Sequence, residues 1–67
     1  MCEANAYLLG ENGEVLIMES VDHVSPEGDG LKLVNIFGEQ KFLRAVIHSL
    51  SLVDHKVFLK RLDDRDG

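Results

Sequence analysis

Short apolar runs alternate along the chain with turn signals, and this pattern predicts an all-β fold. Asn12-Gly13 separates an apolar run at residues 4–9 from a second run at residues 15–24. Asn-Gly between two such runs is the strongest short signal for a β-hairpin, because both turn positions favour a positive φ angle. The sequence therefore predicts a hairpin close to its N-terminal end.

Further turn signals divide the middle of the chain. Residues 25–30 contain one proline and two glycines, which predicts a loop. Residues 31–37 are rich in β-branched and apolar side chains and are typical of a strand. Residues 38–40 then predict a turn into a short apolar run at 41–43.

The segment at residues 45–53 fits two periodicities. Its side chains can be placed alternately on the two faces of a strand, whereas Val46, Leu50 and Val53 also fit helical spacing. No N-capping residue precedes Ala45, so we interpret this segment as a strand.

The end of the chain completes the predicted fold. Residues 54–55 predict a tight turn into a last strand at 56–62, and the polar tail from about residue 63 is expected to fray. Five to seven short strands in 67 residues indicate one domain over residues 1–67, a small SH3-like or Sm-like barrel. A barrel is favoured because closure removes exposed strand edges, and a dimer would cover what closure leaves open.

The small size of the chain limits how it is stabilised. A domain of this length buries only about 60% of its unfolded surface, so small domains often add a disulfide, a metal or a partner chain. The single cysteine cannot form an internal disulfide, which leaves a metal ion or a homodimer. A hydrophobic content of 45% nevertheless argues for a folded core.

Charge and hydropathy exclude several classes of partner. The chain has 12 acidic and 7 basic residues, a formal charge of −5, which argues against nucleic-acid binding. No apolar stretch reaches the roughly 18 residues that cross a bilayer, and no signal peptide is evident. We therefore expect a cytoplasmic protein with no membrane contact.

Cys2 has the strongest case for chemistry in this sequence. It follows Met1, and methionine aminopeptidases remove an initiator methionine that precedes a small residue such as cysteine. A free N-terminal Cys2 would offer an amine and a thiolate that close a chelate ring, with the backbone amide of Glu3 beside them. Planar thiolate–nitrogen sets suit Ni(II) or Cu(II), and tetrahedral ones suit zinc.

One Cys2 supplies too few ligands for a closed metal site. Two copies in a symmetric homodimer would supply two sulfurs and two nitrogens on the two-fold axis. Metal binding and dimerisation would then stabilise the same small fold. The alternative is a cysteine that acts only as a small buried hydrophobe, which position 2 disfavours because chain termini are usually exposed.

The opening Met-Cys-Glu-Ala-Asn-Ala-Tyr-Leu at residues 1–8 resembles the CooT family. Residues 26–31, 35–41 and 52–57 are also similar to its archaeal and clostridial members, so the resemblance covers nearly the whole chain. CooT proteins are small cytoplasmic nickel-binding proteins linked to maturation of the nickel enzyme carbon monoxide dehydrogenase. The resemblance implies an SH3-like barrel, a homodimer, and one Ni(II) per dimer held between the two Cys2 residues.

The histidines are weaker candidates as metal ligands. His48 shares a predicted strand face with Val46 and Leu50, where a histidine is more often a hydrogen-bonded core or interface residue. His55 is expected to be solvated in its turn, and His23 could orient a metal ligand through a hydrogen bond. No two histidines stand at the spacing of a metal motif.

Other chemistry finds little support in the sequence. Residues 28–30 lack the lysine and helix of a phosphate loop, and the acids around them lack EF-hand spacing. We find no nucleophile–base pair, so an enzyme is not expected. The leading hypothesis is a nickel metallochaperone or maturation factor, and the alternative is an Sm-like module that contacts RNA or protein without metal.

Overall fold

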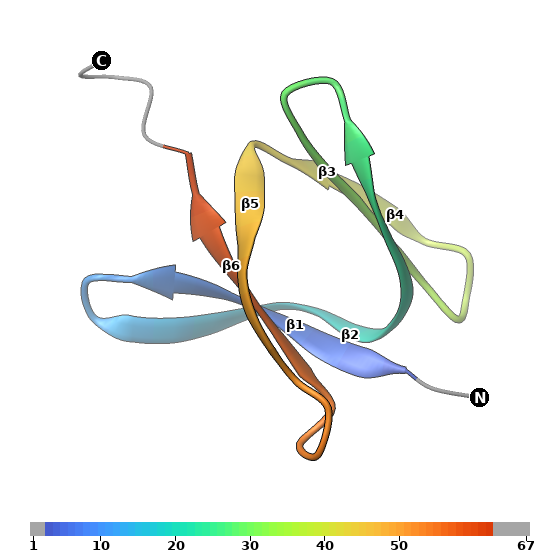
Figure 1. Cartoon of the computed structure of the whole chain (residues 1–67). Helices are drawn as coiled ribbons and strands as arrows, with labels where there is room; N and C mark the ends of the chain where they lie inside the picture. Colours follow the sequence, from blue (N-terminus) through green and yellow to red (C-terminus); the bar gives the residue numbers. More distant parts are fainter. Residues whose placement is uncertain (1–2, 63–67) are drawn as a thin grey trace.

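The structure is a computed structural model that describes residues 3–62, and it contains one six-stranded sheet. The strands are β1 (Ala4–Gly10), β2 (Gly13–Glu27), β3 (Gly30–Asn35), β4 (Gln40–Leu43), β5 (Ala45–Ser51) and β6 (Lys56–Arg61). Their order in the sheet is β4-β3-β2-β1-β6-β5. Figure 1 shows this sheet curled into a half-barrel, and residues 3–62 contain no helix. The all-β prediction is confirmed.

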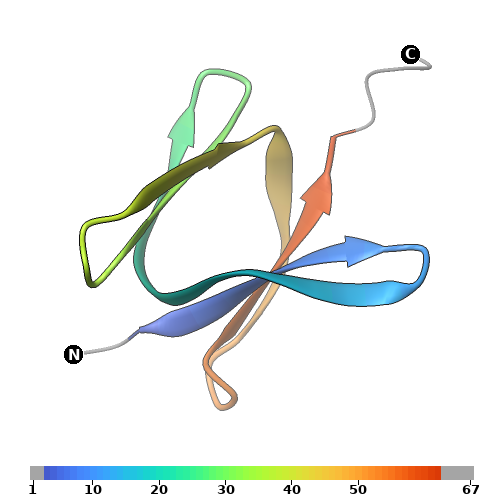
Figure 2. The ribbon, with the colours of Figure 1, turned by 180° about the vertical axis from the view of Figure 1, so that it is seen from behind.

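The half-barrel is open along one side. Strands β4 and β5 are the two edges of the sheet, although only Arg44 separates them in sequence. Both views show the chain turning a corner between these strands, after which they diverge (Figures 1 and 2). The backbone N–H of Leu62 donates to the carbonyl of Arg44 at 2.9 Å and fastens the end of β6 to this corner. Curling therefore covers one face of the sheet but leaves two strand edges.

Strand β2 bends so that it serves both halves of the sheet. Its first half is antiparallel to β1, its second half is antiparallel to β3, and Val21 lies opposite a residue of each. The ladder skips a residue on each side of this point, and Ser20 has a φ of 56°. Bulges of this kind bend a strand and increase its twist. The bend in β2 therefore contributes to the curvature of the sheet.

The concave face of the sheet holds the core. The buried apolar residues come from five of the six strands and are Ala6, Met18, Val21, Leu31, Leu33, Ala45, Val57 and Leu59. Leu43 of β4 packs against them and is partly buried. This core is small, as expected from the length of the chain.

The prediction of a loop at residues 25–30 is wrong, because most of these residues, including Pro26, lie in strands. Strand β2 continues through Pro26, which lies opposite Leu31, and the turn is reduced to Gly28-Asp29. Pairing with β1 ends at Val21, so beyond that residue β2 has a partner strand on one side only. Proline is tolerated on such a free side because no ladder hydrogen bond is lost there.

Other predicted boundaries shift by one or two residues. The N-terminal hairpin is confirmed, but Glu11-Asn12 forms its loop and Gly13, with a φ of 110°, begins β2. Residues 36–37 belong to the β3–β4 turn and residues 52–53 to the β5–β6 turn, where strands were predicted. Apolar side chains in turns mimic strand patterns, which explains both differences.

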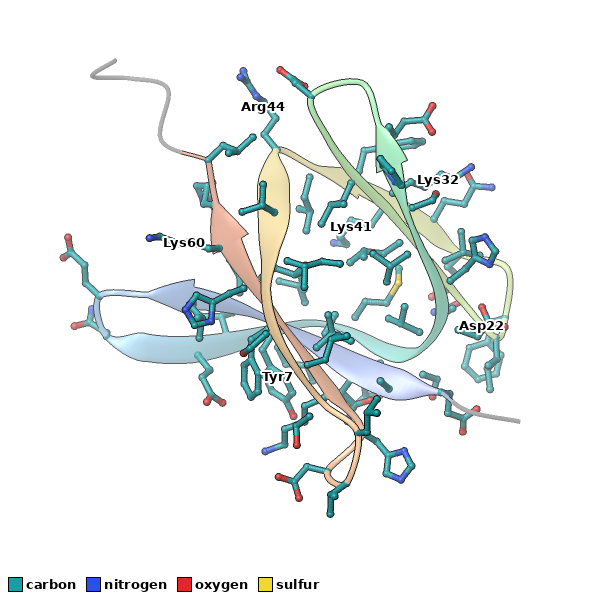
Figure 3. All side chains as sticks on the ribbon, in the orientation of Figure 1. Tyr7, Asp22, Lys32, Lys41, Arg44 and Lys60 are labelled. Carbon is teal, nitrogen blue, oxygen red and sulfur yellow. The ribbon has the colours of Figure 1, made fainter. Side chains whose placement is uncertain are left out.

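The β2–β3 turn lies against the corner between β4 and β5. Asp29 forms an ion pair with Arg44 at 3.0 Å, and Figure 3 shows Arg44 at this corner. A Cβ added at Gly30 would overlap the carbonyl oxygen of Leu43. The close approach of two backbones therefore requires glycine at position 30.

We expect Gly30→Ala to lower the thermal midpoint because the clash is with backbone, which cannot rotate away. An overpacked site of this kind costs about 1–3 kcal/mol. Gly10→Ala is the matched control, since a Cβ there would meet only an ordinary contact at 3.8 Å. Thermal unfolding followed by circular dichroism should show a clear loss for Gly30→Ala and a smaller change for Gly10→Ala. Equal midpoints for the two variants would contradict the close approach.

Candidate functional site

The predicted metal ligand Cys2 lies outside the described residues, so the structure describes its surroundings from Glu3 onward. Glu3 is exposed and directly precedes β1. It lines a hollow of about 340 Å³ together with residues of β2, β5, β6 and the β5–β6 turn. We call this the N-terminal hollow.

The walls of the N-terminal hollow are apolar. They are formed by Ala4, Val21, Val24, Leu50, Leu52 and Val57. Ala4, Val21 and Val57 pack in or against the core, whereas Leu50 and Leu52 are 57% and 82% exposed. The start of β1 therefore adjoins an apolar surface that the chain itself leaves open to solvent.

Asn5 anchors the start of β1 to both of its neighbours. Its backbone N–H donates to the carbonyl of His55 at 3.0 Å, and its side-chain oxygen accepts the N–H of Ser20 at 3.2 Å. His55 has a φ of 56°, a left-handed conformation in which histidine is enriched among the non-glycine residues. These contacts hold the entry to β1 between the β2 bend and the β5–β6 turn.

Two of the three histidines lie beside this entry. His23 and His55 both line the N-terminal hollow, together with Glu3 and Asp22, and both are exposed. Within residues 3–62, however, no three His, Asp or Glu side chains gather closely enough to hold a metal ion. His23 and His55 are therefore neighbours of Glu3, and with the other described residues they do not form a separate metal centre.

His48 occupies a different place from the one predicted. The ladder between β5 and β6 skips a residue between Ile47 and Ser49, so His48 is the extra residue of a bulge. Ile47 and Leu50 lie opposite the buried Leu59 and Val57, whereas Val46 lies opposite Lys60 on the other face.

The prediction that His48 shares one face with Val46 and Leu50 is therefore wrong. His48 is exposed, and its Nδ1 lies 3.3 Å from the hydroxyl of Ser49. It borders a shallow hollow with Glu11 and Lys60, away from the N-terminal hollow.

The N-terminal hollow is lined by residues of both charges. They include the acidic residues Glu3 and Asp22 and the basic residue Lys56. The Lys56 Nζ lies over the ring of Tyr7, 5.4 Å from its centroid, and that ring stacks on Phe58 at 5.8 Å. This cation–π contact directs the Lys56 ammonium group toward the Tyr7 ring.

The exposed apolar surface beside the chain start was not predicted as part of a site. The signal was present in residues 45–53, which are apolar at positions that fit both a strand and a helix. One neighbouring layer cannot cover apolar side chains on more than one face. In the structure Leu50 and Leu52 remain exposed.

Within residues 3–62, no helix has the length and apolar character needed to cross a membrane. The described residues form a curved β-scaffold, seen in Figure 1, that places Glu3 at the edge of an open apolar hollow. The predicted ligand Cys2 directly precedes Glu3 in the sequence.

Comparison with known proteins identifies the family. The model of the CooT family, described as CO dehydrogenase accessory protein CooT, matches residues 1–60. A crystal structure named for CooT from Carboxydothermus hydrogenoformans matches with a TM-score of 0.86 and 45% identity, over 92% of this chain and 100% of that one. An uncharacterized protein of Methanocaldococcus jannaschii is 33% identical over 60 residues, 90% of this chain and 98% of that protein. This chain belongs to the CooT family.

Proposed function

We propose that this chain is a nickel-binding metallochaperone or maturation factor for carbon monoxide dehydrogenase. The observation that carries the proposal is the match of residues 1–60 to a family of CO dehydrogenase accessory proteins. An accessory protein for a nickel enzyme has nickel as its natural cargo. The role requires a metal-binding group and a partner, and it requires no catalysis by the chain itself.

In this proposal the Cys2 thiolate and N-terminal backbone nitrogens hold Ni(II). With Met1 removed, the amine and thiolate of Cys2 chelate the metal, and the backbone nitrogen of Glu3 is the next donor along the chain. Ni(II) accepts nitrogen and sulfur ligands in planar geometry, so this donor set fits the ion. The anchoring of Asn5 supports the proposal, because it holds the entry to β1 in place close to Cys2 in the sequence.

The proposal includes a homodimer that shares one nickel ion. Leu50, Leu52 and Val53 form an exposed apolar surface, and the first two also line the hollow beside Glu3. Burial of this surface against a second copy would stabilise a small domain and would bring two chain starts toward one two-fold axis. Two chains would then complete the four-coordinate site that one chain cannot form.

The experiment is a nickel titration of this protein, expressed in the cytoplasm and purified with its native N-terminus. We expect a sulfur-to-nickel charge-transfer band in the near ultraviolet that saturates at about one nickel per two chains. Light scattering on the same samples should report a dimer when the metal is bound. Saturation at one nickel per chain with independent sites would contradict the shared site.

The matched control for this titration retains Met1, as confirmed by mass spectrometry. Peptide linkage converts the amine of Cys2 into an amide, so this form keeps the thiol but loses the amine. We expect it to bind nickel more weakly than the processed chain. Equal binding by the two forms would exclude the amine as a ligand.

A further inference from the structure

The turn between β3 and β4 is built around a buried asparagine. Asn35 is 5% exposed, and its side-chain oxygen accepts the backbone N–H groups of Phe37 at 3.0 Å and Glu39 at 2.9 Å. Its side-chain nitrogen donates to the carboxylate of Glu39 at 2.8 Å. One side chain thus satisfies two backbone donors and one carboxylate oxygen.

Backbone hydrogen bonds complete this support. Asn35 donates to the carbonyl of Glu39 at 3.1 Å, Gly38 donates to the carbonyl of Asn35 at 3.0 Å, and Ile36 donates to the carbonyl of Ser20 at 2.9 Å. Every backbone N–H from residue 35 to residue 39 therefore has an acceptor. Gly38 has a φ of 84°, which suits glycine. The turn is held in one conformation.

This rigid turn presents an aromatic side chain to solvent. Phe37 is 75% exposed and contributes little to the core. Closing a turn does not require an aromatic residue, and water disfavours the exposed ring. Aromatic side chains on preorganised supports are typical anchors of protein interfaces, because little conformational entropy is lost when they bind.

A hollow of about 460 Å³ adjoins Phe37 and combines an apolar floor with carboxylates. Leu16, Ile17 and Met18 contribute apolar surface, and the charged side chains at the hollow are Glu19, Glu39 and Lys41. Carboxylates outnumber the ammonium group here, as acids outnumber bases in the whole chain. A partner that accepts Phe37 would be attracted if positive charge surrounded its pocket.

We propose that Phe37 and this hollow dock the protein onto its client enzyme, at an apolar pocket with a basic rim. The identity of the client, carbon monoxide dehydrogenase, rests on the proposed function. None of the residues that line this hollow lines the N-terminal hollow, so docking and metal binding use separate surfaces. A nucleic acid is disfavoured by the carboxylates, and a second copy would bring the same acids together.

The first test compares two exposed phenylalanines in binding to purified carbon monoxide dehydrogenase from the same organism. Phe42 is 59% exposed, lies on β4 and does not line the hollow, so Phe42→Ala is the matched control. We expect Phe37→Ala to raise the dissociation constant by about 30-fold, a typical loss for an aromatic anchor. Phe42→Ala should change it by less than about twofold. Circular dichroism and thermal unfolding confirm that both variants are folded.

The second test concerns the carboxylates and uses Glu19→Gln combined with Glu39→Gln. Glutamine at position 39 keeps an oxygen that can accept from the Asn35 amide, so the turn is retained while the charge is lost. We expect slower association with the dehydrogenase and a weaker dependence on salt concentration.

Nickel binding to each variant separates this inference from the proposed function. Phe37→Ala should retain the nickel–thiolate band, because the ring lies outside the N-terminal hollow. If Phe37→Ala bound the dehydrogenase as tightly as the unaltered chain does, the docking surface would be wrong. It would also be wrong if the unaltered chain did not bind the dehydrogenase, whether nickel is present or absent. If the chain instead docks through Phe37 but shows no nickel–thiolate band, the docking surface stands and the nickel proposal fails.

Discussion

Replacement of Cys2 by serine is expected to abolish the nickel–thiolate band and to weaken nickel binding by at least about 100-fold. Even loss of a group that only supports a ligand typically costs 10–100-fold in metal affinity, and here the ligand itself is removed. Serine retains the size, the N-terminal amine after processing and the backbone, but its hydroxyl is a hard and weakly acidic donor. The measurement is a nickel titration by near-ultraviolet absorbance and calorimetry on protein with a verified N-terminus.

The control for this substitution is Glu3→Ala. It removes the carboxylate on the rim of the N-terminal hollow and retains the backbone nitrogen proposed as a donor. We expect the charge-transfer band to persist, with at most a modest loss of affinity from the missing negative charge. If Cys2→Ser bound nickel as tightly as the unaltered chain, the thiolate could not be a ligand.

The second large effect is expected in the core, where Leu33→Ala should leave much of the protein unfolded. Leu33 is fully buried on β3, which lies between β2 and β4 in the sheet. Truncation of a buried leucine costs about 2–5 kcal/mol. The whole domain has a free energy of unfolding of about 3–10 kcal/mol on the usual per-residue scale. A single substitution therefore removes a large share of the stability.

Leu52→Ala provides the matched control, since this leucine is 82% exposed in the β5–β6 turn. Its loss should change the free energy of unfolding by less than about 0.5 kcal/mol in the metal-free monomer. Urea unfolding followed by circular dichroism, at low protein concentration and without nickel, compares the two variants. Similar midpoints for both would mean that the core is not where the structure places it.

The same two leucines show the limit of sequence patterns. Both leucines lie in apolar runs beside lysine, serine or valine. No neighbouring residue in the sequence distinguishes the buried leucine from the leucine in a turn. Leu33 is buried because β2 and β4 flank its strand and the curled sheet covers its inner face. Leu52 follows the last residue of an edge strand, where the described chain supplies no cover.

The strand pattern, the N-terminal hairpin and the all-β class were predictable because they depend on local chemistry. Apolar and β-branched runs favour extended backbone, and Asn-Gly favours a tight reversal regardless of the remaining chain. The prediction of Cys2 as a metal ligand also came from the sequence alone, because Cys2 lies outside the described residues.

The bulge at His48 was decided by the tertiary structure. A bulge is defined by the pairing of two strands, so the sequence of one strand does not reveal it. Pro26 can remain in β2 because the pairing between β1 and β2 stops at Val21 and leaves one side of Pro26 without a partner strand. The rigid display of Phe37 required Asn35 to be buried opposite Val21, which is distant in sequence.

For this protein, then, the sequence by itself determined most of the strand segments, and it alone singled out Cys2 as the expected metal ligand. The tertiary structure decided which apolar side chains are covered and which remain open, at the N-terminal hollow and at Phe37. The physical reason is that backbone propensity and donor chemistry belong to single residues. Burial belongs to the neighbours that the curled sheet brings together.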